Sequence, residues 1–323
     1  MNFTAIDNRG TVEGFCLIKT VDRKVSTKGD AYLDMTLADK DGEINAKLWS
    51  YSPTQHGEYE VNQIVKIRGT VSVYNGNDQL RIERIRHITD ADGVDPNDYV
   101  KSADYDSAAM FDELHRLAEG YRDADLSRLV LHLLDKNRAA LLYWPAAFRL
   151  HHAIRGGLLM HTLSIVRLCE RVCEIYPFVD RDLLLAGATL HDIAKLTEFT
   201  VADTGVASGY SVKGNLIGHL AEGAIQVRKA AEELGIPPEK SMLIEHMILS
   251  HHGEPEFGAA VKPAFIEAEL LSELDLMDAR VYEMHEAVLA TPENDFSAKL
   301  WALDNRKLYN HSRTDLGSVP KLF

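Results

Sequence analysis

Five sites along the chain place a histidine or an aspartate inside an apolar segment, where such residues are costly unless they have a task. They are His161, His191 with Asp192, His219, His251 with His252, and Asp275. Imidazole nitrogens and carboxylate oxygens are the ligands that first-row divalent metals accept in proteins. One histidine in an apolar segment is usually a hydrogen-bonded core residue, but five such sites together favour a metal centre.

The spacing of these sites matches the length of a helix hairpin. From His161 to Asp275, successive sites are 30, 28, 32 and 24 residues apart. Helix bundles build metal sites from side chains on facing helices, so four or five packed helices could each supply one ligand. The neighbours His191 and Asp192 diverge by about 100° on a helix. Both can therefore reach one centre only if metals lie beside the helix, with the carboxylate able to bridge two of them.

Lys195 belongs to the same constellation. It lies four residues after His191 and three after Asp192, a spacing that places all three on one helix face. An ammonium group there could meet a phosphate or a water held by the metals.

The elements that must position these residues are helices. From Ser107 onward, apolar residues recur with helical period, and the pattern predicts helices around 158–175, 182–196, 216–234, 239–250, 264–290 and 296–309. The second part of the chain is therefore predicted to be all-α.

The first ninety residues have a different period. Strands are predicted at 13–21, 31–38, 43–49, 64–74 and 79–88, where β-branched and aromatic residues alternate with polar ones. The Asn75-Gly76 step favours a tight turn and makes the last two strands a hairpin. Five short strands in this length are typical of an OB-type barrel.

The predicted fold class is thus a multidomain α and β protein. Residues 1–90 form an OB-type barrel and 106–323 an all-α domain, with the metal centre within 151–280. Residues 91–105 are polar, acidic and interrupted by Gly93 and Pro96, as is typical of a linker.

Composition narrows the class of protein. The chain has 323 residues, 46% of them hydrophobic, and no long apolar run is free of charges, so neither a disordered protein nor a membrane span is expected. No signal peptide is evident and there are only three cysteines, which favours the cytoplasm. The net charge of −14 argues against a nucleic-acid partner at first. However, residues 1–90 carry 12 basic and 13 acidic residues, and local patches or bound cations can still hold phosphates.

The order of these motifs along the chain resembles that of a known family. The order H…HD…H…H…D is similar to that of the HD-domain phosphohydrolase superfamily. More narrowly, an OB-type module followed by HHAIRGGLLMHT, LLLAGATLHDIAKLTEF, VKGNLIGHL and HMILSHHGEPEFG resembles the YhaM family of 3′→5′ exoribonucleases. One departure is Ala194, where that family usually has glycine. The motif GYP of cyclic-dinucleotide phosphodiesterases does not follow Gly253.

The resemblance implies a set of metal ligands. One metal would be held by His161, His191, Asp192 and Asp275. Asp192 would bridge to a second metal, held by His219 and His251. Asp278, three residues after Asp275, is the alternative last ligand.

The resemblance also implies the chemistry. A water activated by two divalent ions would hydrolyse single-stranded RNA, and single-stranded DNA as a further substrate, to nucleoside monophosphates. Asp192, Lys195 and His252 would be catalytic, with Lys195 and His252 touching the scissile phosphate. Arg155 is a further phosphate contact or, equally, part of a structural ion pair. The family points to manganese, while the mixed ligands alone would also accept iron, cobalt or nickel.

The barrel would bind the single strand by stacking bases on aromatic side chains beside basic ones. The candidate contacts are Lys19, Tyr32, Tyr74, Arg81 and Arg84. Phe15 and Trp49 are assigned to the barrel core instead. The barrel could alternatively bind a neighbouring subunit, and a homo-oligomer is a possible partner state.

Two other functions remain open from the sequence. One is an HD phosphohydrolase acting on a free nucleotide, with a structural barrel. The other is a nucleic-acid-binding protein without catalysis.

Overall fold

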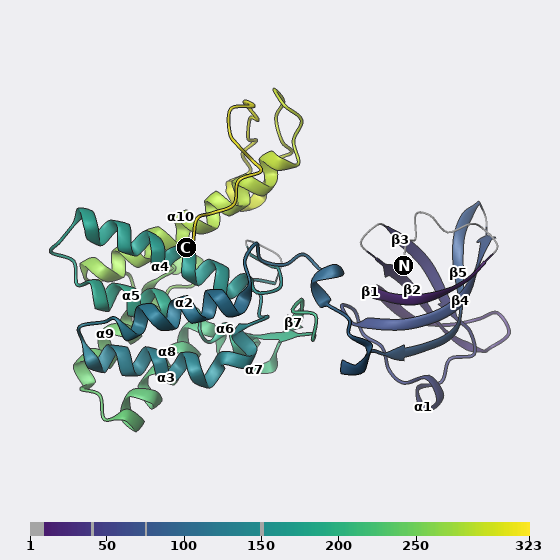
Figure 1. Cartoon of the computed structure of the whole chain (residues 1–323), viewed down its shortest axis with the longest axis horizontal. Coiled ribbons are helices and arrows are strands. Elements are labelled where there is room, and N and C mark those ends of the chain that lie inside the picture. Colours follow the sequence, from purple (N-terminus) through teal and green to yellow (C-terminus); the bar gives the residue numbers. More distant parts are fainter. Residues whose placement is uncertain (1–9, 40–41, 75, 149–151) are drawn as a thin grey trace. The chain divides into compact units, whose positions relative to one another are not determined.

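The structure is a computed structural model that describes residues 10–39, 42–74, 76–148 and 152–323. The chain divides into two compact units (Figure 1). The first comprises Met1–Lys101 together with Val201–Ser208, and the second comprises Ser102–Thr200 and Gly209–Phe323. The second part predicted from the sequence, 106–323, therefore gives up one short segment to the first unit. None of the described helices is both long and apolar enough to cross a lipid bilayer.

Five strands close into a barrel in the first unit. They are β1 (Thr11–Val25), β2 (Ala31–Ala38), β3 (Glu43–Leu48), β4 (Ile64–Tyr74) and β5 (Asn77–His87), with the one-turn helix α1 (Pro53–His56) between β3 and β4. The strand order is β1-β2-β3-β5-β4, and β4 pairs with β1 to close the sheet. Only β3 and β5 pair in parallel; the other neighbours are antiparallel. This is the five-stranded barrel expected from the sequence.

Strand alternation explains the barrel core. Inward residues of all five strands are buried, for example Met35, Leu37, Ile67 and Leu80. Tyr74 pairs with Asn77, so the turn between β4 and β5 is as short as the sequence predicts, although Asn75 itself lies outside the described residues.

The assignment of Trp49 to the core is wrong. Its side chain is 40% exposed, and its ring stacks on Tyr32 with centroids 4.6 Å apart. Phe15 is only half-buried. Alternation decides both cases: Trp49 follows buried Leu48 and so points outward.

Helices make up most of the second unit (Figure 1). They are α2 (Ser107–Glu119), α3 (Ala124–Leu141), α4 (Gly157–Ile175), α5 (Arg181–Leu190), α6 (Lys195–Glu198), α7 (Val212–Leu216), α8 (Gly218–Leu234), α9 (Pro238–Ser250) and α10 (Ile266–Leu289). Helix α5 is central: it contacts α3, α4, α9 and α10, and every residue from Asp182 to Leu190 is buried. Asp180 caps its start by accepting a hydrogen bond from the Leu183 amide.

The region after α5 differs from the prediction in two ways. The helix expected over 182–196 ends at Leu190, and His191 to Ala194 form turns before α6. A short hairpin of β6 (Phe199–Val201) and β7 (Ala207–Tyr210) follows, which the all-α prediction did not include.

The helix expected over 296–309 is absent. This segment folds back on itself through the bridges Leu300↔Arg306 and Phe296↔Tyr309, with only a 3-10 turn at Trp301–Leu303. Asp304 and Asn305 both have φ of 57°, the left-handed pair that a tight reversal requires. Apolar periodicity cannot detect such a reversal.

Candidate metal centre

His191 and Asp192 directly follow the last residue of α5, and their side chains face one centre. His191 keeps helical dihedral angles, with φ of −53° and ψ of −39°, and its amide donates to the Gly187 oxygen. Nε2 of His191 lies 3.2 Å from Oδ2 of Asp192. Both residues are almost fully buried, at 0% and 2% exposure. The end of the central helix thus presents an imidazole and a carboxylate together.

The α4 and α10 helices complete one side of this centre. Nε2 of His161, on α4, lies 3.1 Å from Oδ1 of Asp275 on α10 and 3.7 Å from Oδ2 of Asp192. Nε2 of His191 is 4.0 Å from the same Asp275 oxygen. Two imidazoles and two carboxylates therefore converge here, from α4, from α10 and from the turn that follows α5.

On the other side, Asp192 turns its second oxygen to two further imidazoles. His219 is the second residue of α8 and His251 directly follows α9. Their Nε2 atoms lie 3.6 and 3.7 Å from Oδ1 of Asp192. The Asp192 carboxylate thus stands between two pairs of histidines, with one oxygen toward each pair.

These atoms fit divalent metal ions. Among the described residues, Nε2 of His191, His219 and His251 and Oδ1 of Asp192 are buried and have no hydrogen-bond partner. Leaving buried polar atoms unpaired costs roughly 1–3 kcal/mol each, so a cluster of four calls for a ligand. Two donors that each lie about 2.1 Å from one ion are roughly 3.0–3.4 Å apart, close to the separations here.

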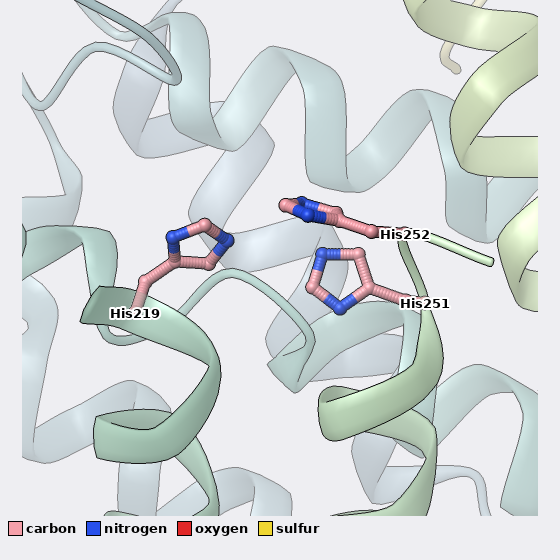
Figure 2. A group of neighbouring side chains, drawn as sticks. All are labelled: His219, His251 and His252. Atoms are coloured by element: carbon pink, nitrogen blue, oxygen red, sulfur yellow. The ribbon is translucent and has the colours of Figure 1, made fainter. Parts of the chain in front are cut away.

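His252 lies against the second pair. In Figure 2 the rings of His219, His251 and His252 face one another, from the start of α8 and the end of α9. The ligand atoms of the three residues lie within 4.8 Å of one another. His252 is half-buried, and burial with nearby His219 lowers its pKa. The structure thus places His252 beside the histidines expected to bind metal.

Lys195 reaches the same carboxylate from α6. Its Nζ lies 2.6 Å from Oδ2 of Asp192, and its backbone oxygen accepts a hydrogen bond from the Trp144 indole at 2.9 Å. Burial would lower the pKa of Lys195, but the charge of Asp192 outweighs it and raises that pKa. The site therefore holds one buried ammonium next to its central carboxylate.

Asp192 and His251 are in the protonation states of metal ligands. Burial would raise the pKa of Asp192, but Lys195 and then His191 hold it well below the usual value. Burial and the neighbouring His191 lower the pKa of His251. An anionic carboxylate and a neutral imidazole are the forms that bind a metal. For His161, burial would lower the pKa, but hydrogen bonds to Asp275 and Asp278 outweigh it and raise the pKa to about 10, so an ion there would displace a proton.

Each of the four imidazoles also donates from Nδ1. His161 donates to Oδ2 of Asp278 at 2.8 Å, and His219 donates to Oε1 of Glu198 at 2.9 Å. His191 and His251 donate to backbone oxygens three residues earlier, each at 2.8 Å. Asp278 therefore lies on the far side of the His161 ring from Asp275, and of the two aspartates only Asp275 is placed with the Nε2 atoms. Sequence reasoning missed Glu198 altogether, because nothing in KLTEF distinguishes it from a surface residue.

Arg155 precedes the start of α4. Its guanidinium carbon lies 5.6 Å from the ring centroid of Tyr143, and its backbone bridges to Ser102. Its role as a phosphate contact stays a prediction.

The barrel gathers some of its predicted nucleic-acid contacts and separates others. Tyr32 on β2 lies beside Trp49, and Lys47 lies over the Tyr32 ring, 5.2 Å from its centroid. Lys47 pairs with Arg81 on β5, so the four side chains share one outer face of β2, β3 and β5. We call these four residues the aromatic-basic face.

The other three candidates are exposed but lie elsewhere on the barrel. Tyr74 is at the end of β4, and Lys19 is at a bulge in β1. Arg84 stands opposite Arg68 on β4.

Comparison with known proteins identifies the family. The HD domain model matches residues 158–280. The 3′-5′ exoribonuclease YhaM of Listeria welshimeri is 38% identical over 300 residues, which cover 93% of this chain and 95% of the relative. The YhaM protein of Shouchella clausii is 37% identical over 301 residues, covering 93% of each chain.

Two of the solved structures that are similar to this chain cover about a quarter of it. One is the yeast mitochondrial single-stranded DNA binding protein Rim1, at 15% identity, covering 25% of this chain and 97% of that chain with a TM-score of 0.22. Another is replication protein A bound to single-stranded DNA, at 15% identity, 26% and 62% coverage and a TM-score of 0.22. These scores are too low to carry an argument. The identity over nearly the full length of both relatives does carry one: this chain belongs to the YhaM family.

Proposed function

We propose that this chain is a metal-dependent 3′→5′ exoribonuclease that hydrolyses single-stranded RNA to nucleoside monophosphates. The observation that carries the proposal is the cluster of buried, unpaired ligand atoms around Asp192, in a chain of this family. Membership of a family does not by itself mean that the metal site is intact in this chain. The converging imidazoles of His191, His219 and His251 support an intact site.

The proposal assigns ligands on the two sides of Asp192. His161, His191, Asp192 and Asp275 hold one ion, and Asp192, His219 and His251 hold the other. The distances between their donor atoms, from 3.1 to 4.0 Å, support this division. We propose manganese as the metal, although iron, cobalt and nickel suit the same mixed ligands.

Two such ions, when bound, supply a nucleophile at neutral pH and neutralise charge on the phosphoryl oxygens. The chain's own residues do the rest. Asp192 is held in one orientation by Lys195, at 2.6 Å, so that its two oxygens stay directed to the two sides. Lys195 offers positive charge that stabilises the charge developing on the phosphate. His252, which lies beside the second pair of histidines, is proposed to contact the same phosphate, and Arg155 is proposed as a further contact.

The barrel is proposed to hold the single strand upstream of the cleaved end. The aromatic-basic face supports this, because exposed aromatic rings next to cations bind bases by stacking and phosphates by charge. Lys19, Tyr74 and Arg84 are proposed as additional contacts along the strand. The same contacts do not read the sugar, so single-stranded DNA is a proposed second substrate.

The test is hydrolysis of a 5′-labelled single-stranded RNA with Mn²⁺, with products resolved by length. We expect a ladder that shortens one nucleotide at a time, loss of activity with chelator, and recovery when Mn²⁺ is restored. If the labelled RNA stays at full length while free nucleotides are hydrolysed, the chain is instead a nucleotide phosphohydrolase. Binding of RNA without any hydrolysis would establish a non-catalytic protein.

A further inference from the structure

The four metal-facing histidines are supported from behind in two different ways. A metal-binding imidazole uses one nitrogen for the ion, and the hydrogen bond at the other nitrogen fixes its tautomer and orientation. Here His191 and His251 donate from Nδ1 to backbone oxygens, whereas His161 and His219 donate to carboxylates. Each side of Asp192 therefore has one imidazole supported by the backbone and one supported by an acidic side chain.

Asp278 supports His161 from the same helix that supplies Asp275. The two aspartates are three residues apart on α10, so they lie on one face. Asp275 faces Nε2 of His161 at 3.1 Å, and Asp278 faces Nδ1 at 2.8 Å. Asp278 is itself fixed, since it accepts hydrogen bonds from His152 at 3.0 Å and from the Ser164 hydroxyl. One turn of α10 thus holds both edges of a single imidazole.

Glu198 supports His219 at the end of α6. Its Oε1 accepts from Nδ1 of His219 at 2.9 Å and from the His219 backbone amide at 3.2 Å. Glu198 is 8% exposed, so its charge is largely shielded from water. The short helix α6 therefore supplies Lys195 to the central carboxylate and Glu198 to the imidazole of the second side.

We propose that Asp278 and Glu198 are positioning residues that set the metal affinity of the two sides independently: Asp278 through His161, and Glu198 through His219. The inference rests on the ligand assignment of the proposed function. Carboxylates in this position also make the imidazole a stronger metal ligand. Losing such a carboxylate typically costs 10–100-fold in metal affinity or activity. Because each carboxylate acts on a different imidazole, removing one of them should weaken the binding of one ion and leave the binding of the other unchanged.

The test is titration of the full-length, metal-free protein with Mn²⁺ by calorimetry, with electron paramagnetic resonance to detect coupled ions. Wild type should bind two ions per chain. Asp278→Asn and Glu198→Gln keep an oxygen acceptor but lose the charge, so each should weaken one binding step about tenfold. Asp278→Ala and Glu198→Ala should weaken the same step by up to about 100-fold.

Glu245→Gln is the matched control. Glu245 is another buried carboxylate of this unit, on α9, but it pairs with Arg228 rather than with a metal-facing histidine. This variant should bind both ions with wild-type affinity, even if it unfolds at a lower temperature. A positioning role also predicts that the lost RNA hydrolysis of Glu198→Gln returns at high Mn²⁺ with an unchanged KM for RNA.

The outcomes separate the two proposals. If wild type binds no divalent ion, the proposed function fails and the inference fails with it. If wild type binds two ions and both isosteric variants bind them equally well, the inference alone is overturned. Equal weakening of both steps, matched by Glu245→Gln, would show a general effect on folding and would also overturn it.

Discussion

A single carboxylate organises the site at the scale of residues. Asp192 directs Oδ1 to His219 and His251 and Oδ2 to His191 and Lys195. Its burial would favour the neutral acid, yet the surrounding cation and imidazoles keep its pKa low. Any replacement at this position must therefore disturb both sides of the centre together.

Asp192→Ala should abolish hydrolysis, with a loss of more than about 1,000-fold, because it removes a ligand from both proposed ions. Binding of single-stranded RNA should remain within about twofold, since the proposed strand contacts lie in the barrel. Activity assays and fluorescence anisotropy with a labelled RNA check this. Glu245→Gln again serves as the control, because it removes the charge of a buried carboxylate outside the metal centre. Loss of RNA binding in Asp192→Ala would contradict the assignment of strand binding to the barrel and of hydrolysis to the metal centre.

At the scale of elements, the outer face of the barrel carries the feature that sequence reasoning undervalued. Trp49, which directly follows β3, stacks on Tyr32 of β2, and Lys47 completes a cation–π contact. An exposed stacked pair offers a flat surface to a base, which a buried tryptophan cannot.

Trp49→Ala should weaken binding of a long single-stranded RNA by roughly tenfold, since stacking on one aromatic side chain contributes about 1–3 kcal/mol. Turnover of a di- or trinucleotide should change little, because such a substrate need not reach the barrel. Trp301, 73% exposed and outside the barrel unit, gives the matched control Trp301→Ala. Equal loss of affinity in both variants would count against a role for this face.

Asp34 lies beside the aromatic-basic face and restrains one of its cations, Lys47. Its carboxylate contacts Lys24 at 2.8 Å and Lys47 at 3.2 Å. Burial raises its pKa, but hydrogen bonds from Lys24 and Asn45 outweigh this and lower it to about 2. A carboxyl whose pKa is depressed on folding stabilises the fold above its unfolded pKa, about 3.9, and loses that contribution as the pH falls toward 2.

Asp34→Asn should therefore lower the stability of the chain at pH 7 by roughly 1 kcal/mol after screening by solvent. The difference from wild type should shrink between pH 4 and pH 2. The urea midpoint, followed by circular dichroism at several pH values, measures it. RNA affinity should rise by at most about fivefold, since Lys47 is released. A difference in stability that persists unchanged at pH 2 would refute the electrostatic explanation.

The limits of sequence reasoning also follow particular elements. Strands β2 and β4 begin and end where alternation predicts, and the five histidine and aspartate sites meet at one centre. Periodicity could not show that α5 stops before His191. It also could not show the reversal at Asp304 and Asn305, which depends on left-handed backbone. The role of Glu198 depends on a contact across 21 residues that no local pattern encodes.

At the scale of the whole molecule, the chain enters the barrel unit more than once. After Thr200 it contributes Val201–Ser208 to that unit, where the Thr204 hydroxyl donates to the Asn62 backbone oxygen at 2.7 Å. The polar stretch 91–105 is thus one of three passages of the backbone between the units.

Cutting the backbone once, at a protease site introduced after Gly93, should not yield two independent pieces. The amino-terminal fragment would keep Asn62, while its packing partner Thr204 would remain on the carboxyl-terminal fragment. We expect the nicked halves to migrate together in size-exclusion chromatography without denaturant, and separate peaks would refute this. Expression as two co-produced halves then becomes feasible, whereas a barrel expressed alone would lack the segment Val201–Ser208 that belongs to its own unit.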